Sequence, residues 1–277
     1  LPEHFTMICF GKRRSGKTFS LIHTLNAIKD RFERAYLFSG TAGLQNDFKC
    51  IPKKNQFVGL DETKLGQIIE QQRGIRMYNN DMEESGSDDL KKLVKPNPIL
   101  ICFDDIIQDA KIRRSPLLNE LFTLGRQLRI STIILSQTIS GQTASLPPVV
   151  RNNAEIIQCF QTFNEYDLEL LGSQFASLID KKSGKQFLTN ITKEKFTSAI
   201  IDNANPQALS YSEYIYRYKV PAKQPKFQIG KADIKKEKKG PYNKNREKNK
   251  LTVDKLVLRP STIDFDQEYS FKNSGNK

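Results

Sequence analysis

One eight-residue stretch, GKRRSGKT at residues 11–18, restricts the fold of this chain more than any other feature. It matches the pattern G-x-x-x-x-G-K-[ST], in which the backbone N–H groups of a tight loop bind nucleotide phosphates. The pattern is informative when a strand precedes it and a helix follows. Here an apolar run at residues 4–10 comes before it, and apolar residues recur at helical spacing through 19–30. The surroundings therefore predict a phosphate-binding loop.

This pattern assigns roles to individual residues of the loop. Backbone N–H groups of the loop and of the next helix are expected to face the β- and γ-phosphates. Lys17 is expected to lie between these phosphates and the Thr18 hydroxyl to bind Mg²⁺. Three alternatives are open for Arg13 and Arg14 inside the loop: contact with phosphate, contact with a neighbouring subunit, or a position in solvent. The predicted nucleotide-binding residues are Gly11, Lys12, Arg13, Arg14, Ser15, Gly16, Lys17 and Thr18.

A second apolar run supplies the carboxylates that such a loop needs. The sequence NPILICFDDI at residues 97–106 is typical of a central parallel strand, and it ends in Asp104 and Asp105. Ligands of open α/β sheets bind at the carboxyl ends of strands. Asp104 is therefore predicted to hold Mg²⁺ through water and Asp105 to polarise the attacking water, although the two roles can be divided differently.

A third apolar run, ISTIILSQ at residues 130–137, ends in an amide. An amide at the tip of a strand can hydrogen-bond both the γ-phosphate and the attacking water, so Gln137 is a candidate sensor. One helix, at residues 115–129, separates this strand from the Asp104–Asp105 strand, with Ser115 as the expected N-cap.

Strands alternate with helices along the chain, which predicts an α/β sheet with right-handed crossovers. We expect a RecA-like P-loop NTPase with a mainly parallel central sheet flanked by helices, and a basic C-terminal tail. Further strands are expected at 34–40, 154–160 and 196–202, helices near 62–73 and 164–182, and a loop or insertion at 79–95.

The net charge of +13 is concentrated near the C-terminus. Residues 221–250 hold eleven Lys/Arg and three acids, so they carry eight of these charges. Such a basic, apolar-poor segment with several Pro and Gly residues buries too little surface to fold alone. We therefore expect a P-loop ATPase domain at 1–220 and a flexible tail at 221–277. The tail binds nucleic acid, extends into solvent or acts as a targeting sequence.

Cysteine usage and hydropathy predict the compartment. Cys9, Cys50, Cys102 and Cys159 are scattered without a C-x-x-C pair, which favours buried free thiols in a reducing compartment. No run of 18 apolar residues and no signal peptide is visible. We expect a soluble intracellular protein with no membrane partner.

Several classes of phosphate-loop protein lack support in the sequence. A GTPase carries an N/T-K-x-D motif after the acidic strand, and TKEK at 192–195 lacks the aspartate. The signature of an ABC ATPase precedes that strand, whereas ISGQ at 139–142 follows it and is incomplete. Nothing marks the acceptor pocket that a small-molecule kinase needs.

Four segments in order, GKRRSGKT, ILICFDD, LFTLGRQLRISTIILSQ and LPPVVRNN, resemble the poxvirus-type genome-packaging ATPases of the FtsK–HerA superfamily. The resemblance spans roughly residues 5–175. It implies ATP and Mg²⁺ as cofactors, a homo-oligomeric ring of five or six subunits around double-stranded DNA, and capsid proteins as further partners. It also implies location in the host cytoplasm, at the viral assembly site or in the virion.

In such rings the resemblance implies that an arginine of one subunit reaches the γ-phosphate bound by its neighbour. Arg126, late in a predicted helix, and Arg151, after the Leu-Pro-Pro turn, are the candidates, with Arg126 preferred. Both also fit a structural role. Many members carry Glu where this chain has Asp105, which is shorter by one methylene and leaves its role as catalytic base open.

The sequence supports three functions. The leading one is an ATP-driven motor that translocates double-stranded DNA into a viral capsid. The alternatives are an ATP-dependent helicase or conjugation-type DNA pump, and a nucleotide-gated assembly scaffold with little turnover.

Overall fold

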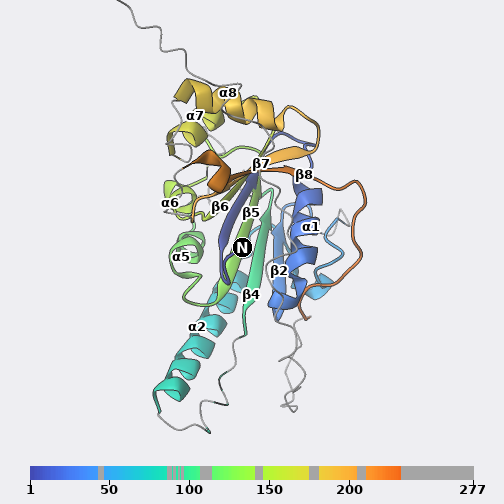
Figure 1. Ribbon diagram of the computed structural model, residues 1–277. Coiled ribbons are helices and arrows are strands. Elements are labelled where there is room, and N and C mark those ends of the chain that lie inside the picture. Colours follow the sequence, from blue (N-terminus) through green and yellow to red (C-terminus); the bar gives the residue numbers. More distant parts are fainter. Residues whose placement is uncertain are drawn as a thin grey trace, which may run out of the picture.

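The computed structural model describes residues 1–231, except 43–46, 86–88, 90, 91, 93, 95, 96, 107–113, 141–145, 175–180 and 205–209. Helices cover both faces of one central sheet (Figure 1). The strands are β1 (Thr6–Phe10), β2 (Arg34–Ser39), β3 (Gln56–Val58), β4 (Ile99–Asp104), β5 (Ile130–Ser136), β6 (Ile156–Phe160), β7 (Thr197–Asp202) and β8 (Ile215–Lys219). The α-helices are α1 (Lys17–Ile28), α2 (Glu62–Glu84), α5 (Pro116–Leu124), α6 (Pro148–Asn152), α7 (Glu165–Gln174) and α8 (Lys181–Thr192), with short 3₁₀ turns at Lys29–Arg31, Lys53–Asn55 and Tyr211–Glu213.

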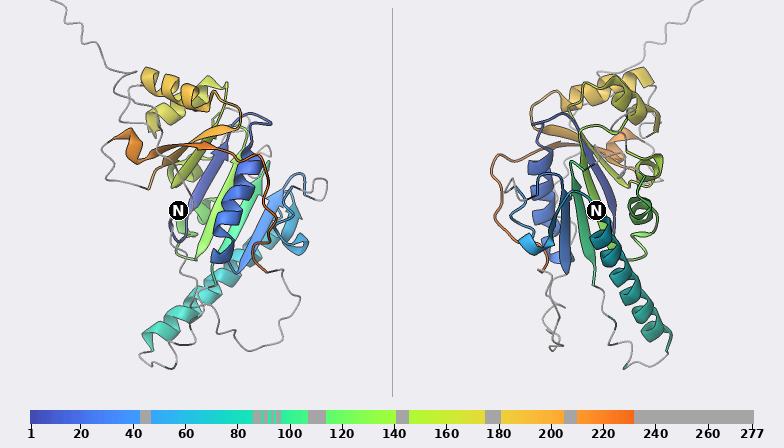
Figure 2. Two further views of the ribbon diagram at one scale, coloured as in Figure 1. Left: turned by 45° about the vertical axis from the view of Figure 1, so that its right-hand side comes forward. Right: turned by 180° about the vertical axis from the view of Figure 1, so that it is seen from behind.

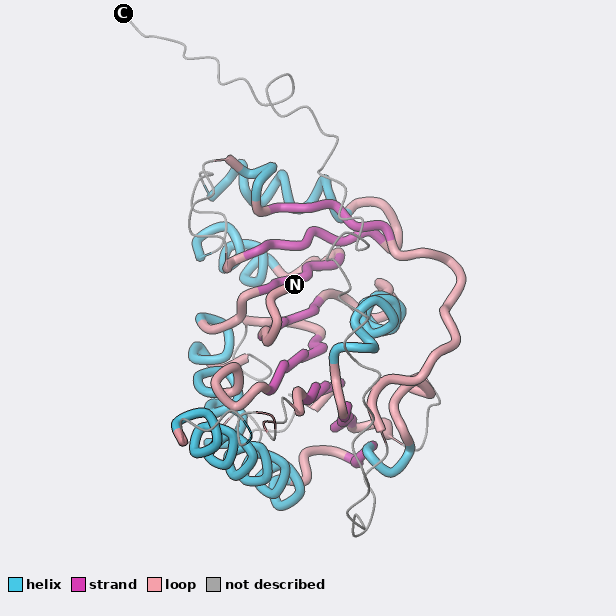
Figure 3. The backbone as a smooth tube through the Cα atoms, turned by 60° about the horizontal axis from the view of Figure 1, so that its bottom comes forward, coloured by secondary structure: helices cyan, strands magenta, loops and turns pink. Residues whose placement is uncertain are grey.

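The eight strands form one sheet in the order β3-β2-β4-β5-β1-β6-β7-β8. The first six are parallel, whereas β7 and β8 are antiparallel additions at one edge. Figure 3 shows the strands side by side with helices on either side. The predicted α/β class with a mainly parallel sheet is therefore confirmed.

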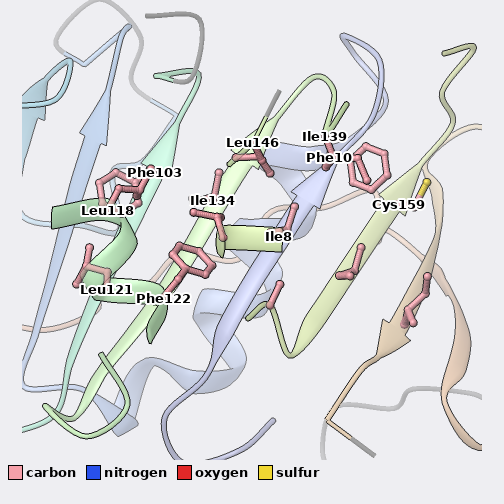
Figure 4. Packing of buried hydrophobic residues seen from close by; sticks show 14 of the residues in the cluster. Ile8, Phe10, Phe103, Leu118, Leu121, Phe122, Ile134, Ile139, Leu146 and Cys159 are labelled. Carbon is pink, nitrogen blue, oxygen red and sulfur yellow. The ribbon is translucent and has the colours of Figure 1, made fainter. Parts of the chain in front are cut away.

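The central strands are mainly apolar because both faces of each are buried. Successive side chains point to opposite faces, so Ile8 and Phe10 join one core cluster while Met7 and Cys9 join the other. The first cluster lies under α2, α5, α6, α7 and α8, and Figure 4 shows Leu118, Leu121 and Phe122 of α5 within it. The second cluster lies under α1.

Four local expectations differ from the structure. Helix α2 continues to Glu84, so residues 79–84 are helical rather than part of a loop. The helix expected at 164–182 ends at Gln174, and a second helix begins at Lys181. Strands β3 and β8 were not expected because both are short and only partly buried. The Ser115 side chain makes no capping hydrogen bond, although Pro116 follows it at the first helical position.

The chain packs against the domain beyond the expected boundary at residue 220. The Ile229 side chain is fully buried in the second core cluster, and its N–H donates to the Cys50 carbonyl at 2.8 Å. Gly230 has φ +68°, and a Cβ there would lie 2.6 Å from the Ala35 nitrogen, so only glycine fits. Figure 2 shows this segment running beside α1. The folded unit therefore includes residues 221–231, and the tail expected after them lies outside the described residues.

All four cysteines are buried and free, as expected. Within the part of the chain that the structure describes, no helix is long and apolar enough to cross a membrane.

A pair of truncations tests the revised boundary. A chain ending at Lys231 is expected to unfold with nearly the stability of the whole protein. A chain ending at Val220 loses the buried Ile229 side chain and one hydrogen-bond partner of buried Asn55. We expect it to lose about 3 kcal/mol of unfolding free energy, measured by urea denaturation. Equal unfolding midpoints for the two truncated proteins would contradict this assignment.

Candidate nucleotide-binding site

The phosphate loop lies between β1 and α1, and its two glycines are sterically required. Gly11 has φ +143°, and a Cβ there would lie 2.6 Å from the Phe160 Cβ. Gly16 has φ +110° and forms the N-cap of α1 without any side-chain capping bond. No side chain therefore caps the first turn of α1, which leaves its backbone N–H groups available to bind an anion.

The ammonium group of Lys17 bonds backbone carbonyls at the start of the loop. Its Nζ donates to the Gly11 carbonyl at 2.7 Å and to the Lys12 carbonyl at 2.9 Å. Burial lowers the Lys17 pKa, while the carboxylates of Asp104 and Asp105 act in the opposite direction. The lysine is thus partly desolvated at the mouth of the loop, where its charge interacts strongly with phosphate.

Ser15 also belongs to the loop, and its side chain is buried. Among the described residues, its hydroxyl oxygen has no hydrogen-bond partner. A buried polar atom without a partner is costly, so a ligand that binds it is favoured. This observation fits a nucleotide phosphate in the loop.

Strand register brings the predicted residues to one edge of the sheet. Phe10 of β1 pairs with Ser136 of β5, and Leu135 of β5 pairs with Asp104 of β4. The residues that follow these strands, Gly11 and Gln137 among them, therefore leave the sheet at the same edge. The carboxyl ends of parallel strands form the ligand-binding edge of open α/β sheets.

Asp104 ends β4 in a largely buried position. Burial raises the pKa of its carboxyl to about 6, and the neighbouring Asp105 charge adds to this effect. The Ser39 hydroxyl, which donates to Asp104 Oδ2 at 3.3 Å, and the Lys17 charge lower it. Because burial disfavours the ionised carboxylate, a cation bound beside it would stabilise its charge.

Asp105, Gln137 and Arg13 form a hydrogen-bonded chain across this edge. The Gln137 amide Nε2 donates to Asp105 Oδ1 at 3.1 Å, and Arg13 Nε donates to Gln137 Oε1 at 3.2 Å. Asp105 has a left-handed backbone with φ +51°, a conformation that Asp tolerates better than most residues. The structure therefore joins three predicted residues from three loops.

The described residues contain no group of three or more His, Cys, Asp or Glu side chains that could hold a metal ion by themselves. Mg²⁺ commonly uses one or two carboxylates together with phosphate oxygens and water. Asp104 at the sheet edge and the Thr18 hydroxyl, in the first turn of α1, fit that type of site.

The two candidate arginines make side-chain contacts with different parts of the chain. Arg126 follows α5 and precedes the amino end of β5, and its Nη1 lies 2.6 Å from Glu155 Oε1. Its side chain is 59% exposed. Arg151 lies in α6, and its Nη1 donates to the Ile139 carbonyl at 3.2 Å, just after Gln137. Neither arginine contacts the phosphate loop of its own chain through any described hydrogen bond.

The sequence patterns did not mark Ser39, Phe196 or Asp167. Ser39 ends β2 beside Asp104, so the rule that polar residues gather at the carboxyl edge would have found it. Phe196 lies over Gly16 because β7 runs antiparallel, and no local signal indicates that contact. Asp167 is completely buried and reaches the loop after Gln137 from a distant helix.

The fold and the loop define a P-loop protein of the α/β class. The family model for the Poxvirus A32 protein matches residues 1–202, and the chain belongs to this family. The expected resemblance to the poxvirus-type packaging ATPases is therefore confirmed at the level of the family.

A curated relative, uncharacterized protein 075L of Invertebrate iridescent virus 6, is 28% identical over 130 residues. These residues are 46% of this chain and 48% of the relative, so the chain spans about half the length of that protein.

Three solved structures are similar at low sequence identity. The genome packaging NTPase B204 of Sulfolobus turreted icosahedral virus 2, in complex with AMPPCP, is 15% identical with a TM-score of 0.49, covering 79% of this chain and 98% of that chain. The pCW3 conjugation coupling protein TcpA is 16% identical with a TM-score of 0.51, covering 72% and 57%. The cytoplasmic domain of the type VII secretion ATPase EccC of Thermomonospora curvata is 13% identical with a TM-score of 0.50, covering 79% and 25%. At these identities the likeness concerns the fold.

The raised pKa of Asp104 predicts a pH-dependent stability. Between pH 3.8 and about 6 the folded protein keeps a proton that the unfolded chain has lost, so stability falls as pH rises through this window. Asp104→Asn removes this cost. In metal-free buffer containing EDTA, we expect the variant to gain thermal stability over the wild type at pH 7.5 and little at pH 4. A stability difference that does not grow with pH would contradict the burial argument.

Proposed function

We propose that this protein is a Mg²⁺-dependent ATPase that translocates double-stranded DNA into a viral capsid as a ring of identical subunits. One observation carries the proposal: the complete GKRRSGKT loop lies at the same sheet edge as Asp104, Asp105 and Gln137, and Gln137 bonds both the loop and Asp105. Membership of the Poxvirus A32 family favours genome packaging as the task.

The residues suit hydrolysis of the bond between the β- and γ-phosphates. Lys17 would release the loop carbonyls and bind phosphate oxygens, since its ammonium already lies inside the loop. Asp104 and Thr18 would hold Mg²⁺, which neutralises the charge of the phosphates. Asp105 would accept the proton of the attacking water, while the Gln137 amide orients that water toward the γ-phosphorus.

A ring of subunits would let an arginine of one chain act at the phosphate bound by its neighbour. Charge that develops in phosphoryl transfer is often stabilised by an arginine from a neighbouring molecule, worth about 10³–10⁵ in rate. Arg126 and Arg151 remain the candidates. Arg126 contacts Glu155 and Arg151 contacts the Ile139 carbonyl, so the two would require different packing of neighbouring subunits.

The activity test compares ATP hydrolysis with and without linear duplex DNA, beside a measurement of oligomer mass by light scattering. Stimulation by duplex DNA supports the translocase. Separation of strands would indicate a helicase, and nucleotide-dependent assembly without turnover would indicate a scaffold. A conjugation-type pump shares the DNA stimulation, so capsid filling in the presence of the capsid proteins is the test that separates it from a packaging motor.

Two substitutions should separate binding from hydrolysis. Lys17→Ala is expected to abolish turnover and weaken ATP binding, because the loop loses its charge at the phosphates. Asp105→Asn is expected to bind ATP normally and lose turnover, because the amide accepts no proton. Binding is measured by titration with a labelled ATP analogue and turnover by phosphate release. Lys64→Ala in α2 is the control for loss of a lysine. Turnover at the wild-type rate in Lys17→Ala would refute the proposal that this protein is an ATPase.

Mixing inactive subunits tests for a shared site. Arg126→Ala subunits keep their own loop, Asp104, Asp105 and Gln137, so they should bind ATP while turnover falls by about 10³-fold or more. Combined with Lys17→Ala subunits, some interfaces pair an intact loop with an intact Arg126, and turnover should partly return. The same mixture with Arg151→Ala tests the other arginine. If mixed oligomers form and only the Arg151→Ala mixture recovers turnover, the assignment moves to Arg151.

A further inference from the structure

The side chain of Asp167, in the first turn of α7, is fully buried and holds the segment that follows Gln137. Its Oδ1 accepts from the Ile139 N–H at 3.1 Å, and from the Ser140 N–H at 2.8 Å. The same oxygen lies 2.7 Å from the Thr138 hydroxyl and 2.6 Å from the Ser140 hydroxyl. Its second oxygen accepts from the Thr162 hydroxyl at 3.4 Å. One carboxylate thus bonds every residue from 138 to 140.

A buried carboxylate is retained at a cost unless donors surround it. Here two backbone N–H groups and the hydroxyls nearby supply those donors, and the first turn of a helix favours negative charge. An apolar side chain would fill the same space without desolvation of a charge, but it would leave the N–H groups of Ile139 and Ser140 unpaired. The carboxylate therefore fixes the path of this backbone.

The fixed segment determines where Gln137 lies. On one side of Gln137, Ser136 is held by its pairing with Phe10 of β1, and its hydroxyl donates to the Thr138 carbonyl at 2.6 Å. On the other side, Thr138 is held by Asp167. Gln137 spans these two anchors, and its amide contacts Asp105 at 3.1 Å and Arg13 at 3.2 Å.

Asn164, just before α7, adds a second link between α7 and this segment. Its side-chain amide donates to the Thr138 hydroxyl at 3.0 Å. On the other side of the segment, the Ile139 carbonyl accepts from Arg151 at 3.2 Å. The peptide group between Ile139 and Ser140 therefore donates its N–H to Asp167 and accepts at its carbonyl from Arg151.

We propose that Asp167 is a positioning residue for hydrolysis: it anchors residues 138–140 so that the Gln137 amide stays in reach of Asp105 and the attacking water. This inference rests on the proposed ATPase function. The carboxylate bonds residues 138–140 and acts through them on Gln137. It also makes α7 the structural link between Gln137 and Arg151.

The first test compares Asp167→Ala with Asp167→Asn. In Asp167→Ala the 138–140 segment loses its anchor, so kcat should fall at least tenfold while the affinity for a non-hydrolysable ATP analogue changes by less than about threefold. Asn keeps an oxygen that can accept the same bonds, so Asp167→Asn should recover most of kcat. Asn55→Ala, which removes buried hydrogen bonds far from the loop, controls for general loss of stability.

A double-mutant cycle with Gln137→Ala distinguishes positioning from a purely structural role. If Asp167 acts through Gln137, Asp167→Ala should lower kcat in the wild type and have little further effect in Gln137→Ala. Its effect on the unfolding temperature should be the same in both backgrounds. An equal fall of kcat in both backgrounds, or an unchanged kcat in Asp167→Ala, would overturn the proposal.

Amide hydrogen exchange tests the anchor without any reference to turnover. The amides of Ile139 and Ser140 should lose protection in Asp167→Ala and keep it in Asp167→Asn. Unchanged protection in Asp167→Ala would overturn the proposal. A wild-type protein without ATPase activity would refute the ATPase function, and the role of Asp167 in hydrolysis with it, while lost protection would still establish that Asp167 anchors the segment.

Discussion

The in-register parallel pairing of β4, β5 and β1 is the constraint on which the site depends. Because Asp104 pairs with Leu135, and Ser136 with Phe10, the three strands end within a residue or two of one another. Polar side chains that follow them meet at one edge, as Arg13 and Gln137 do, although 124 residues of sequence separate these two. A register slip of one residue in β5 would turn its buried side chains to the opposite face and carry Gln137 away from the phosphate loop.

Burial shifts the pKa values of the ionisable side chains at this edge. The same strands that bury an apolar core bring Lys17 and Asp104 into partly desolvated positions, which lowers the pKa of the lysine and raises that of the aspartate. Both shifts disfavour the charged groups in the ligand-free site. Phosphate and a divalent cation would replace the solvation that these groups have lost. Binding of a nucleotide would therefore stabilise the charged forms of Lys17 and Asp104 and would be favoured in a fixed orientation.

Helix α7 shows that the candidate site extends beyond the loops which carry Asp105 and Gln137. Asp167 and Asn164 hold the segment after Gln137, and that segment holds Arg151. The positions of the Gln137 amide and of Arg151 thus depend on the same few hydrogen bonds.

The sequence by itself determined the α/β class, the phosphate loop and the carboxyl-edge residues Asp104, Asp105 and Gln137. This was possible because a buried parallel strand is a mainly apolar run, and polar residues mark the point where it ends. The sequence also identified the Poxvirus A32 family from motifs that stand in order. Only the tertiary structure decided what Ile229 and Asp167 do, since each acts on residues far away in the chain. A lone isoleucine in a basic segment and an aspartate early in a helix look like surface residues in sequence. Their burial, and the unpaired backbone groups that they satisfy, exist only once the sheet has brought the segments together.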